Sequence, residues 1–167
     1  RLRAIFKGSD KGAELLKKAH LGLFAYVSNR VPEISDHLYS IDQAMCSGYA
    51  WEKGPFELWD MTGVAETVQA AEAQGEKIAP WVKEMIAAGH SAFYISQDGV
   101  RMCYDPASKT YQPLPGGSSF IVLDNYRTAK PVYENAECVL HDIGDGVLCL
   151  EFRSKMNAIG EGILRGI

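Results

Sequence analysis

The spacing of apolar residues changes near residue 90, and this change limits the possible folds more than any other feature of the sequence. Before His90, apolar residues recur every three or four positions, as they do along one face of an α-helix. After His90 they form short runs separated by turn signals, namely Asp98-Gly99 and Gly144-Asp145-Gly146, which is typical of β-hairpins. The sequence therefore predicts a mainly α fold, a helical domain with a small β-hairpin extension.

The part before His90 is predicted to contain four or five helices. The longest extends from Asp10, which fits an N-cap, to about Ile34, and Pro32 should kink or end it. Further helices are expected from Leu38 to Gly48, from Pro55 to Gly63, from Val64 to Gly75 and from Pro80 to Gly89. The stripe of the first helix that is expected to face the core consists of Leu16, His20, Leu23, Val27, Arg30 and Ile34, widened by Ala19, Phe24 and Val31.

The part after His90 is predicted to contain two hairpins and a linker. Strands over 93–95 and 100–104 flank the first turn signal, and strands over 138–140 and 147–152 flank the second. The segment 106–117 is rich in proline and glycine and is predicted to be a linker. The apolar run 120–123 is predicted to be a further short strand.

Composition excludes several classes of partner. The chain has 47% apolar residues, 23% charged residues and a net charge of −4, with both signs interspersed. Because it has neither a basic run nor a long apolar stretch, no nucleic-acid or membrane partner is expected. The four cysteines share no C-x-x-C spacing and the four histidines are scattered, so we expect a reduced, cytoplasmic protein without a metal site. Both ends resemble cut sites, so the chain is expected to be a piece of a larger protein.

Three ordered motifs carry a resemblance to a known family. The chain resembles the C-terminal helical domain of 3-hydroxyacyl-CoA dehydrogenases, in which an Asn-Arg pair on a long helix precedes an Ile-Asp-x-Ala-Met stretch and a Gly-Pro-Phe-Glu-Leu-x-Asp-x-x-Gly segment. The corresponding residues are Ser28-Asn29-Arg30-Val31-Pro32, Ile41-Asp42-Gln43-Ala44-Met45, and Gly54-Pro55-Phe56-Glu57-Leu58-Trp59-Asp60 with Gly63.

A second resemblance covers the last 28 or so residues. This stretch looks like the opening of an enoyl-CoA hydratase (crotonase) domain, in which a first hairpin leads into a helix through a basic residue and an Asn-Ala pair; its residues are 141–152 and Lys155-Met156-Asn157-Ala158-Ile159. The two resemblances together imply a bacterial fused enzyme of fatty-acid β-oxidation. They imply a helical dehydrogenase-type domain at 1–90, a β-rich connector at 91–134 and a truncated crotonase start at 135–167.

The resemblance also implies where the chemistry lies. The NAD-binding Rossmann domain and its catalytic pair would precede Arg1, and the hydratase active site would follow Ile167, so no catalytic residue and no cofactor are expected within the chain. Asn29 is the candidate substrate contact, because the family's Asn approaches the reacting end of the acyl-CoA; local bonding that serves packing is the alternative, favoured if this is the second of two helical repeats. Arg153 and Lys155 are candidates for binding the CoA phosphates, and a solvated pair is the alternative.

The expected function is that of a non-catalytic part of a 3-hydroxyacyl-CoA dehydrogenase, inactive alone. Its role would be to complete the acyl-CoA cleft, hold the missing Rossmann and crotonase domains in register and, through exposed helical surface, form a homodimer. The alternative is a non-enzymatic helical adaptor or interaction domain.

Overall fold

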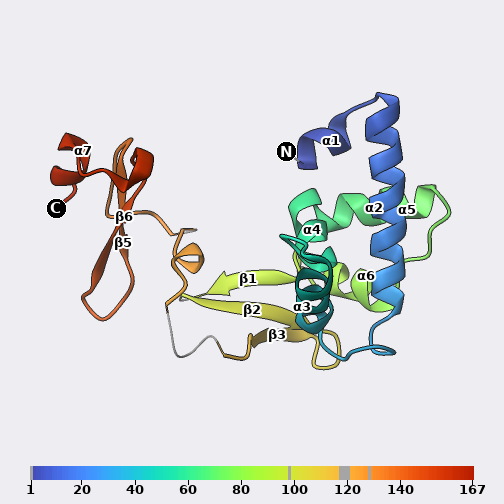
Figure 1. Cartoon of the computed structure of the whole chain (residues 1–167). Helices are drawn as coiled ribbons and strands as arrows, with labels where there is room; N and C mark the ends of the chain where they lie inside the picture. Colours follow the sequence, from blue (N-terminus) through green and yellow to red (C-terminus); the bar gives the residue numbers. More distant parts are fainter. Residues whose placement is uncertain (1, 98, 117–120, 128) are drawn as a thin grey trace. The chain divides into compact units, whose positions relative to one another are not determined.

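The chain divides into two compact units, which are described separately here. The computed structural model describes residues 2–97, 99–116, 121–127 and 129–167 (Figure 1). The first unit comprises Arg1–Ile95 and Met102–Leu114, and the second comprises Ser96–Arg101 and Pro115–Ile167.

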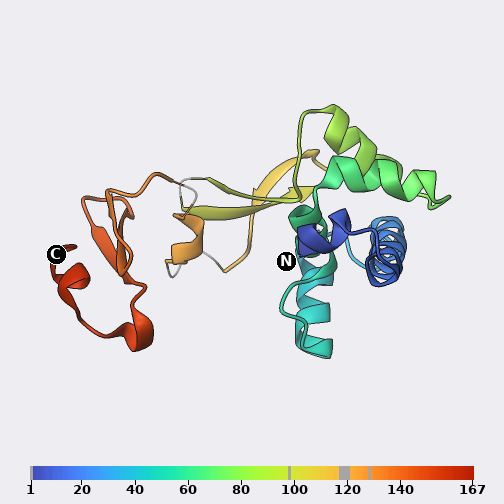
Figure 2. The ribbon, with the colours of Figure 1, turned by 90° about the horizontal axis from the view of Figure 1, so that it is seen from above.

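Six helices make up most of the described part of the first unit. They are α1 (Leu2–Lys7), α2 (Lys11–Asn29), α3 (Leu38–Tyr49), α4 (Pro55–Thr62), α5 (Val64–Ala73) and α6 (Pro80–Ala87). The helix α2 packs against α1, α4 and α5. Figure 2 views α2 nearly along its axis.

Local chemistry places the ends of these helices. Asp10 accepts hydrogen bonds from the backbone N–H groups of Gly12 and Ala13 at 2.8 and 3.0 Å, which confirms it as the N-cap of α2. At α4, Pro55 occupies the first turn, where its missing N–H costs nothing, and Gly63 ends the helix with a φ of 93°. The predicted helices over 55–63, 64–75 and 80–89 are thereby confirmed.

A cluster of stacked aromatic rings forms the centre of the first unit. Trp59 lies between Phe24 and Phe93, with ring centroids 4.9 and 5.0 Å away, and Phe56 packs on Phe93 at 5.1 Å. All four side chains are fully buried. Such rings bury a large apolar area and prefer these offset or tilted arrangements. Because they come from α2, α4 and the residue that precedes the first strand, they join the helices to the sheet.

A three-stranded antiparallel sheet follows the helices, in the order β1 (Tyr94–Gln97), β2 (Val100–Asp105) and β3 (Thr110–Pro113). Strand β2 pairs with β3 so that Tyr104 faces Tyr111. The side chains of Cys103 and Tyr104 are buried with the helical core. The change from helix to strand near residue 90 is therefore confirmed, although most of this sheet belongs to the helical unit.

The second unit contains a smaller antiparallel sheet and short helical turns. Its described elements are η2 (Leu123–Asn125), β4 (Tyr133–Glu134), β5 (Cys138–Asp142), β6 (Leu148–Phe152), η3 (Lys155–Asn157) and α7 (Glu161–Leu164), with the strands in the order β4-β5-β6. The predicted hairpin around Gly144 and Gly146 is confirmed, since β5 and β6 pair from Cys138 opposite Phe152 to Asp142 opposite Leu148.

Several predictions need correction. The described fold is mixed rather than mainly α, because two three-stranded sheets stand where small hairpins were expected. Helix α1 was missed, and α3 continues through Gly48 to Tyr49. The predicted linker contains β3, which pairs with the preceding strand β2 in a hairpin despite its proline. The predicted strand over 120–123 is wrong, because Ile121 and Val122 lie outside any strand and Leu123 begins η2; Phe120, like Asp98, lies outside the described residues.

The face of α2 that meets the core also differs from the prediction. The buried side chains include Leu21, Phe24 and Ser28, whereas Leu16 and Ile34 of the predicted stripe are 41% and 67% exposed. This sequence has apolar residues on more than one side of the helix, so periodicity alone did not select the side that packs. Of the predicted stripe, Phe24, Val27 and Val31 are buried, whereas Leu16, Ala19 and Ile34 lie on the surface.

The hydrogen bond between Trp59 and Thr67 in the aromatic core can be tested by substitution. Trp59 donates its indole N–H to the hydroxyl of Thr67 at 2.6 Å, and both residues are buried. Replacing Thr67 with Val keeps the shape and leaves a buried N–H without an acceptor, which should destabilise the first unit by about 1–3 kcal/mol. Urea unfolding followed by tryptophan fluorescence measures this unit alone, because all three tryptophans lie within residues 51–81.

Thr62→Val is the matched control, since Thr62 donates to the carbonyl of Trp59 at 2.8 Å from the half-buried end of α4. It should cost about 1 kcal/mol or less. Equal losses in the two variants would contradict the role given to Thr67.

Candidate functional site

The C-terminal end of α2 carries a polar network built on Ser28 and Asn29. The hydroxyl of Ser28 donates to the carbonyl of Ala25 at 2.8 Å and accepts from the backbone N–H of Ala79 at 3.1 Å. The amide of Asn29 donates to the carbonyls of Ala25 at 2.8 Å and Lys77 at 2.7 Å. The network therefore fastens the segment before α6 to the last turn of α2.

This geometry bears on the predicted substrate contact of Asn29. The residue is exposed, but its amide nitrogen already donates to two backbone carbonyls. A donation to a substrate carbonyl would have to compete with these bonds. The substrate role of Asn29 stays a prediction. The bonds that the packing alternative expects are present in the structure.

Asp42 on α3 holds the N-terminus of α4. Its carboxylate accepts hydrogen bonds from the backbone N–H groups of Phe56 at 2.9 Å and Glu57 at 3.2 Å, and from the hydroxyl of Tyr94 at 2.7 Å. A carboxylate is favoured at a helix N-terminus, where unpaired N–H groups and the helix dipole attract negative charge. Any side chain at Gly54 would collide with Asp42, since a Cβ there would lie 2.3 Å from the Cβ of Asp42.

Burial raises the pKa of Asp42 to about 6, although the bonds from Phe56 and Tyr94 act in the opposite direction.

Asp60, on α4, binds the first sheet in a similar way. Its two carboxylate oxygens accept from the backbone N–H groups of Phe93 at 2.7 Å and Tyr94 at 2.9 Å. The sequence marked both aspartates only as motif positions, and their long-range partners were missed.

An apolar groove of about 530 Å³ lies between α2, the loop that follows it, and α3. Its volume falls in the range of ligand-binding clefts. Arg30 is the single charged residue among those that line it, and Ser35 and Ser40 are the polar ones. Its apolar lining includes Leu23, Val27, Ile34, Ile41, Met45 and Pro55.

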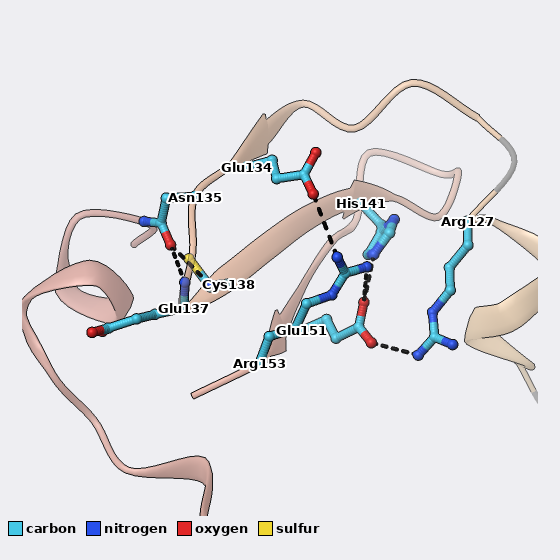
Figure 3. A network of polar contacts seen from close by, with 8 residues as sticks. All are labelled: Arg127, Glu134, Asn135, Glu137, Cys138, His141, Glu151 and Arg153. Carbon is cyan, nitrogen blue, oxygen red and sulfur yellow. Dashed lines mark hydrogen bonds and ion pairs between the residues drawn. The ribbon is translucent and has the colours of Figure 1, made fainter. Parts of the chain in front are cut away.

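The second unit carries a network of charged groups around Glu151 (Figure 3). Glu151 contacts the imidazole Nε2 of buried His141 at 3.0 Å, Nη2 of Arg127 at 2.5 Å and Nη2 of Arg153 at 3.3 Å. The hydrogen bond from His141, followed by the one from Arg127, holds the pKa of Glu151 below its usual value. The contacts of Glu151 with His141 and Arg127 thus link β6 with β5 and with the segment after η2.

The predicted CoA-binding residues differ in their surroundings. Arg153 also reaches Glu134 at 3.4 Å, so two carboxylates face its guanidinium (Figure 3). Lys155 lies in η3 and is exposed. Binding of phosphate by Arg153 would require it to exchange carboxylate partners, and the role of both residues stays a prediction.

Among the described residues, no group of three or more His, Cys, Asp and Glu side chains is arranged to hold a metal ion. None of the described helices has the length and apolar character needed to cross a membrane.

Comparisons with known proteins connect the chain to fatty-acid oxidation enzymes. It is 34% identical over its whole length to a Bacillus subtilis protein named as a 3-hydroxyacyl-CoA dehydrogenase, of which it spans 21%. A stretch of 35 residues is 49% identical to a Rickettsia felis protein named as a fatty acid oxidation complex trifunctional enzyme, covering 21% of this chain and 5% of that protein.

The chain is related to the 3-hydroxyacyl-CoA dehydrogenases.

No family model and no solved structure matches it. The three motifs that carry the resemblance lie at the C-terminal end of α2, in α3 and in α4. The structure gives Asn29, Asp42 and Asp60 within these motifs bonds to distant backbone groups. These residues join the elements of the first unit.

The packing role of Asn29 can be tested in the 167-residue chain. Asn29→Ala removes the bonds to Ala25 and Lys77 and should destabilise the first unit by about 2 kcal/mol, at about 1 kcal/mol for each hydrogen bond. Asn29→Asp should cost more, because a carboxylate would face two carbonyl oxygens. Urea unfolding monitored by tryptophan fluorescence measures both; unchanged midpoints would contradict the packing role.

Asp42 predicts a pH dependence of stability. Its pKa is raised from 3.8 to about 6 in the folded chain, so the folded state binds the proton more tightly than the unfolded state between these values. The contribution of Asp42 to the free energy of unfolding is therefore full below about pH 4 and is lost as the pH rises through about 6. The loss is up to about 3 kcal/mol, from 1.36 kcal/mol per pKa unit.

Asp42→Asn should remove this decline in the fluorescence-monitored unfolding of the first unit between pH 4 and 7. The matched control is Asp36→Asn at an exposed position of the same unit, which should keep the decline. A wild-type slope in Asp42→Asn would show that another group titrates.

Proposed function

We propose that the chain is a non-catalytic part of a longer, NAD-dependent 3-hydroxyacyl-CoA dehydrogenase fused to an enoyl-CoA hydratase. The relation over the full length of the chain to a protein named as a dehydrogenase is the observation that carries this proposal. The shorter match to a protein named as a trifunctional enzyme supports the fusion. The chain spans about a fifth of the first relative, so the activity is assigned to the longer polypeptide.

The proposed role is architectural. Residues 1–90 would act as the C-terminal-type helical domain that completes an acyl-CoA cleft, 91–134 as the connector, and 135–167 as the beginning of the hydratase domain. The rigid join of α3, α4 and β1 through Asp42 and Asp60 suits a part that holds its neighbours in register. NAD would bind outside these residues, Asn29 would approach the substrate, and Arg153 with Lys155 would contact CoA phosphates.

The test compares the 167-residue chain with the longer polypeptide encoded by its reading frame. NADH formation from NAD and a 3-hydroxyacyl-CoA is expected for the longer polypeptide and not for the chain alone, whose folding circular dichroism would confirm. Activity of the isolated chain would overturn the proposed division of labour. An inactive longer polypeptide would instead favour the non-enzymatic adaptor.

The same assay separates the two roles of Asn29. If Asn29 contacts substrate, Asn29→Ala in the longer polypeptide raises KM or lowers kcat at temperatures well below unfolding. If it only fastens the segment before α6, the variant loses stability and keeps its kinetic constants.

A further inference from the structure

A mainly apolar and largely exposed stripe runs along one side of α2. It consists of Leu16, Ala19, Leu23, Tyr26 and Arg30, named here the α2 stripe. Their spacing of three, four, three and four residues keeps them on one side of the helix and is the spacing of a helix–helix seam. In the described structure Leu16 is 41% exposed, Tyr26 is 59% exposed and Ala19 is exposed.

The stripe is separate from the side of α2 that forms the core. That side carries Leu21, Phe24 and Ser28, which are at most 1% exposed. Successive residues of a helix are turned by about 100°, so Leu21, Phe24 and Ser28 point away from the stripe. The helix therefore has one side packed into its own unit and a second side on which Leu16, Ala19 and Tyr26 are exposed and Leu23 is partly buried.

The groove between α2 and α3 continues this surface. Leu23, Tyr26 and Arg30 belong both to the stripe and to the lining of the groove. At the groove, Tyr26 and Ile34 keep more than half of their side chains exposed. A pocket made for a small molecule encloses its ligand, whereas large exposed apolar side chains beside an open groove are typical of a protein-binding surface.

Arg30 indicates which charge a partner of this surface should carry. Its Nη1 pairs with exposed Glu33 at 2.7 Å, and its guanidinium lies 5.3 Å from the ring centre of Tyr26. Its Nε is buried and has no hydrogen-bond partner among the described residues. A guanidinium has five N–H donors, so Arg30 favours a partner with a carboxylate near the C-terminal end of α2.

We propose that the α2 stripe and the adjoining groove dock an amphipathic helix from the same longer polypeptide, outside these 167 residues. The helix would present aliphatic residues at the same spacing of three and four, with an Asp or Glu facing Arg30. The proposal rests on the proposed function, because it takes the chain to be part of a longer enzyme. About four fifths of the first relative lies outside the matched segment, which leaves ample polypeptide to supply the helix.

A photo-reactive benzophenone side chain at position 26 tests the proposal in the longer polypeptide. After irradiation, mass spectrometry should find cross-links to residues outside the 167-residue segment of the same polypeptide, spaced three or four apart. Cross-links to a second copy, or only to residues within the segment, would overturn it. Dehydrogenase activity of the unmodified polypeptide is measured in parallel, so a failure of the proposed function is recognised separately from a failure of the docking site.

A matched pair of substitutions gives a second test. Ala19→Glu on the stripe and Ala70→Glu on α5 both place a carboxylate at an exposed helical alanine. In the 167-residue chain both should be tolerated equally. In the longer polypeptide Ala19→Glu should lower the melting temperature by several degrees more than Ala70→Glu, because it would bury a charge in the seam. Equal melting temperatures there would contradict docking at the stripe.

Discussion

The first unit depends on two carboxylates that hold α4 at both ends. Asp42 receives the N-terminal N–H groups of α4, and Asp60, in the last part of α4, receives the N–H groups of Phe93 and Tyr94. Tyr94 closes the circuit by donating its hydroxyl to Asp42. A buried carboxylate is tolerated only when such bonds replace its water, so α3, α4 and β1 must meet in one arrangement. The aromatic rings around Trp59 can then stack, because their backbones are already fixed.

Local signals were sufficient to predict most helix ends in this unit. Asp10, Pro55 and Pro80 act on backbone groups one to three residues away, and a sequence shows such effects directly. The failures came where a segment's pairing or packing partner decides its structure. The β3 segment resembles a linker until its hairpin pairing with β2 is known, and the packed face of α2 is selected by α4 and α5 rather than by periodicity.

The candidate site, too, could be predicted only in part from the sequence. The motifs that contain Asn29 and Asp42 could be found from residue types and order. The contacts of these residues could not be predicted, because the bonded groups lie up to 52 residues away in the chain. Arg153 was predicted, with Lys155, as a candidate for binding the CoA phosphates, with a solvated pair as the alternative. The carboxylate of Glu134, which contacts Arg153, lies in β4, a strand of two residues that has no detectable sequence signal. The chemical character of these side chains could thus be predicted, but the residues that they contact could not.

The contrast between the interior and the surface of the first unit indicates how the α2 stripe should be understood. Inside, the buried polar groups of Ser28, Asp42 and Thr67 are all hydrogen-bonded, as expected of a well-packed fold. A poorly specified fold would leave errors there as well as exposed apolar residues. The exposed side chains of Leu16 and Tyr26 therefore accompany a complete core, and they are better explained as one half of a contact than as loose packing.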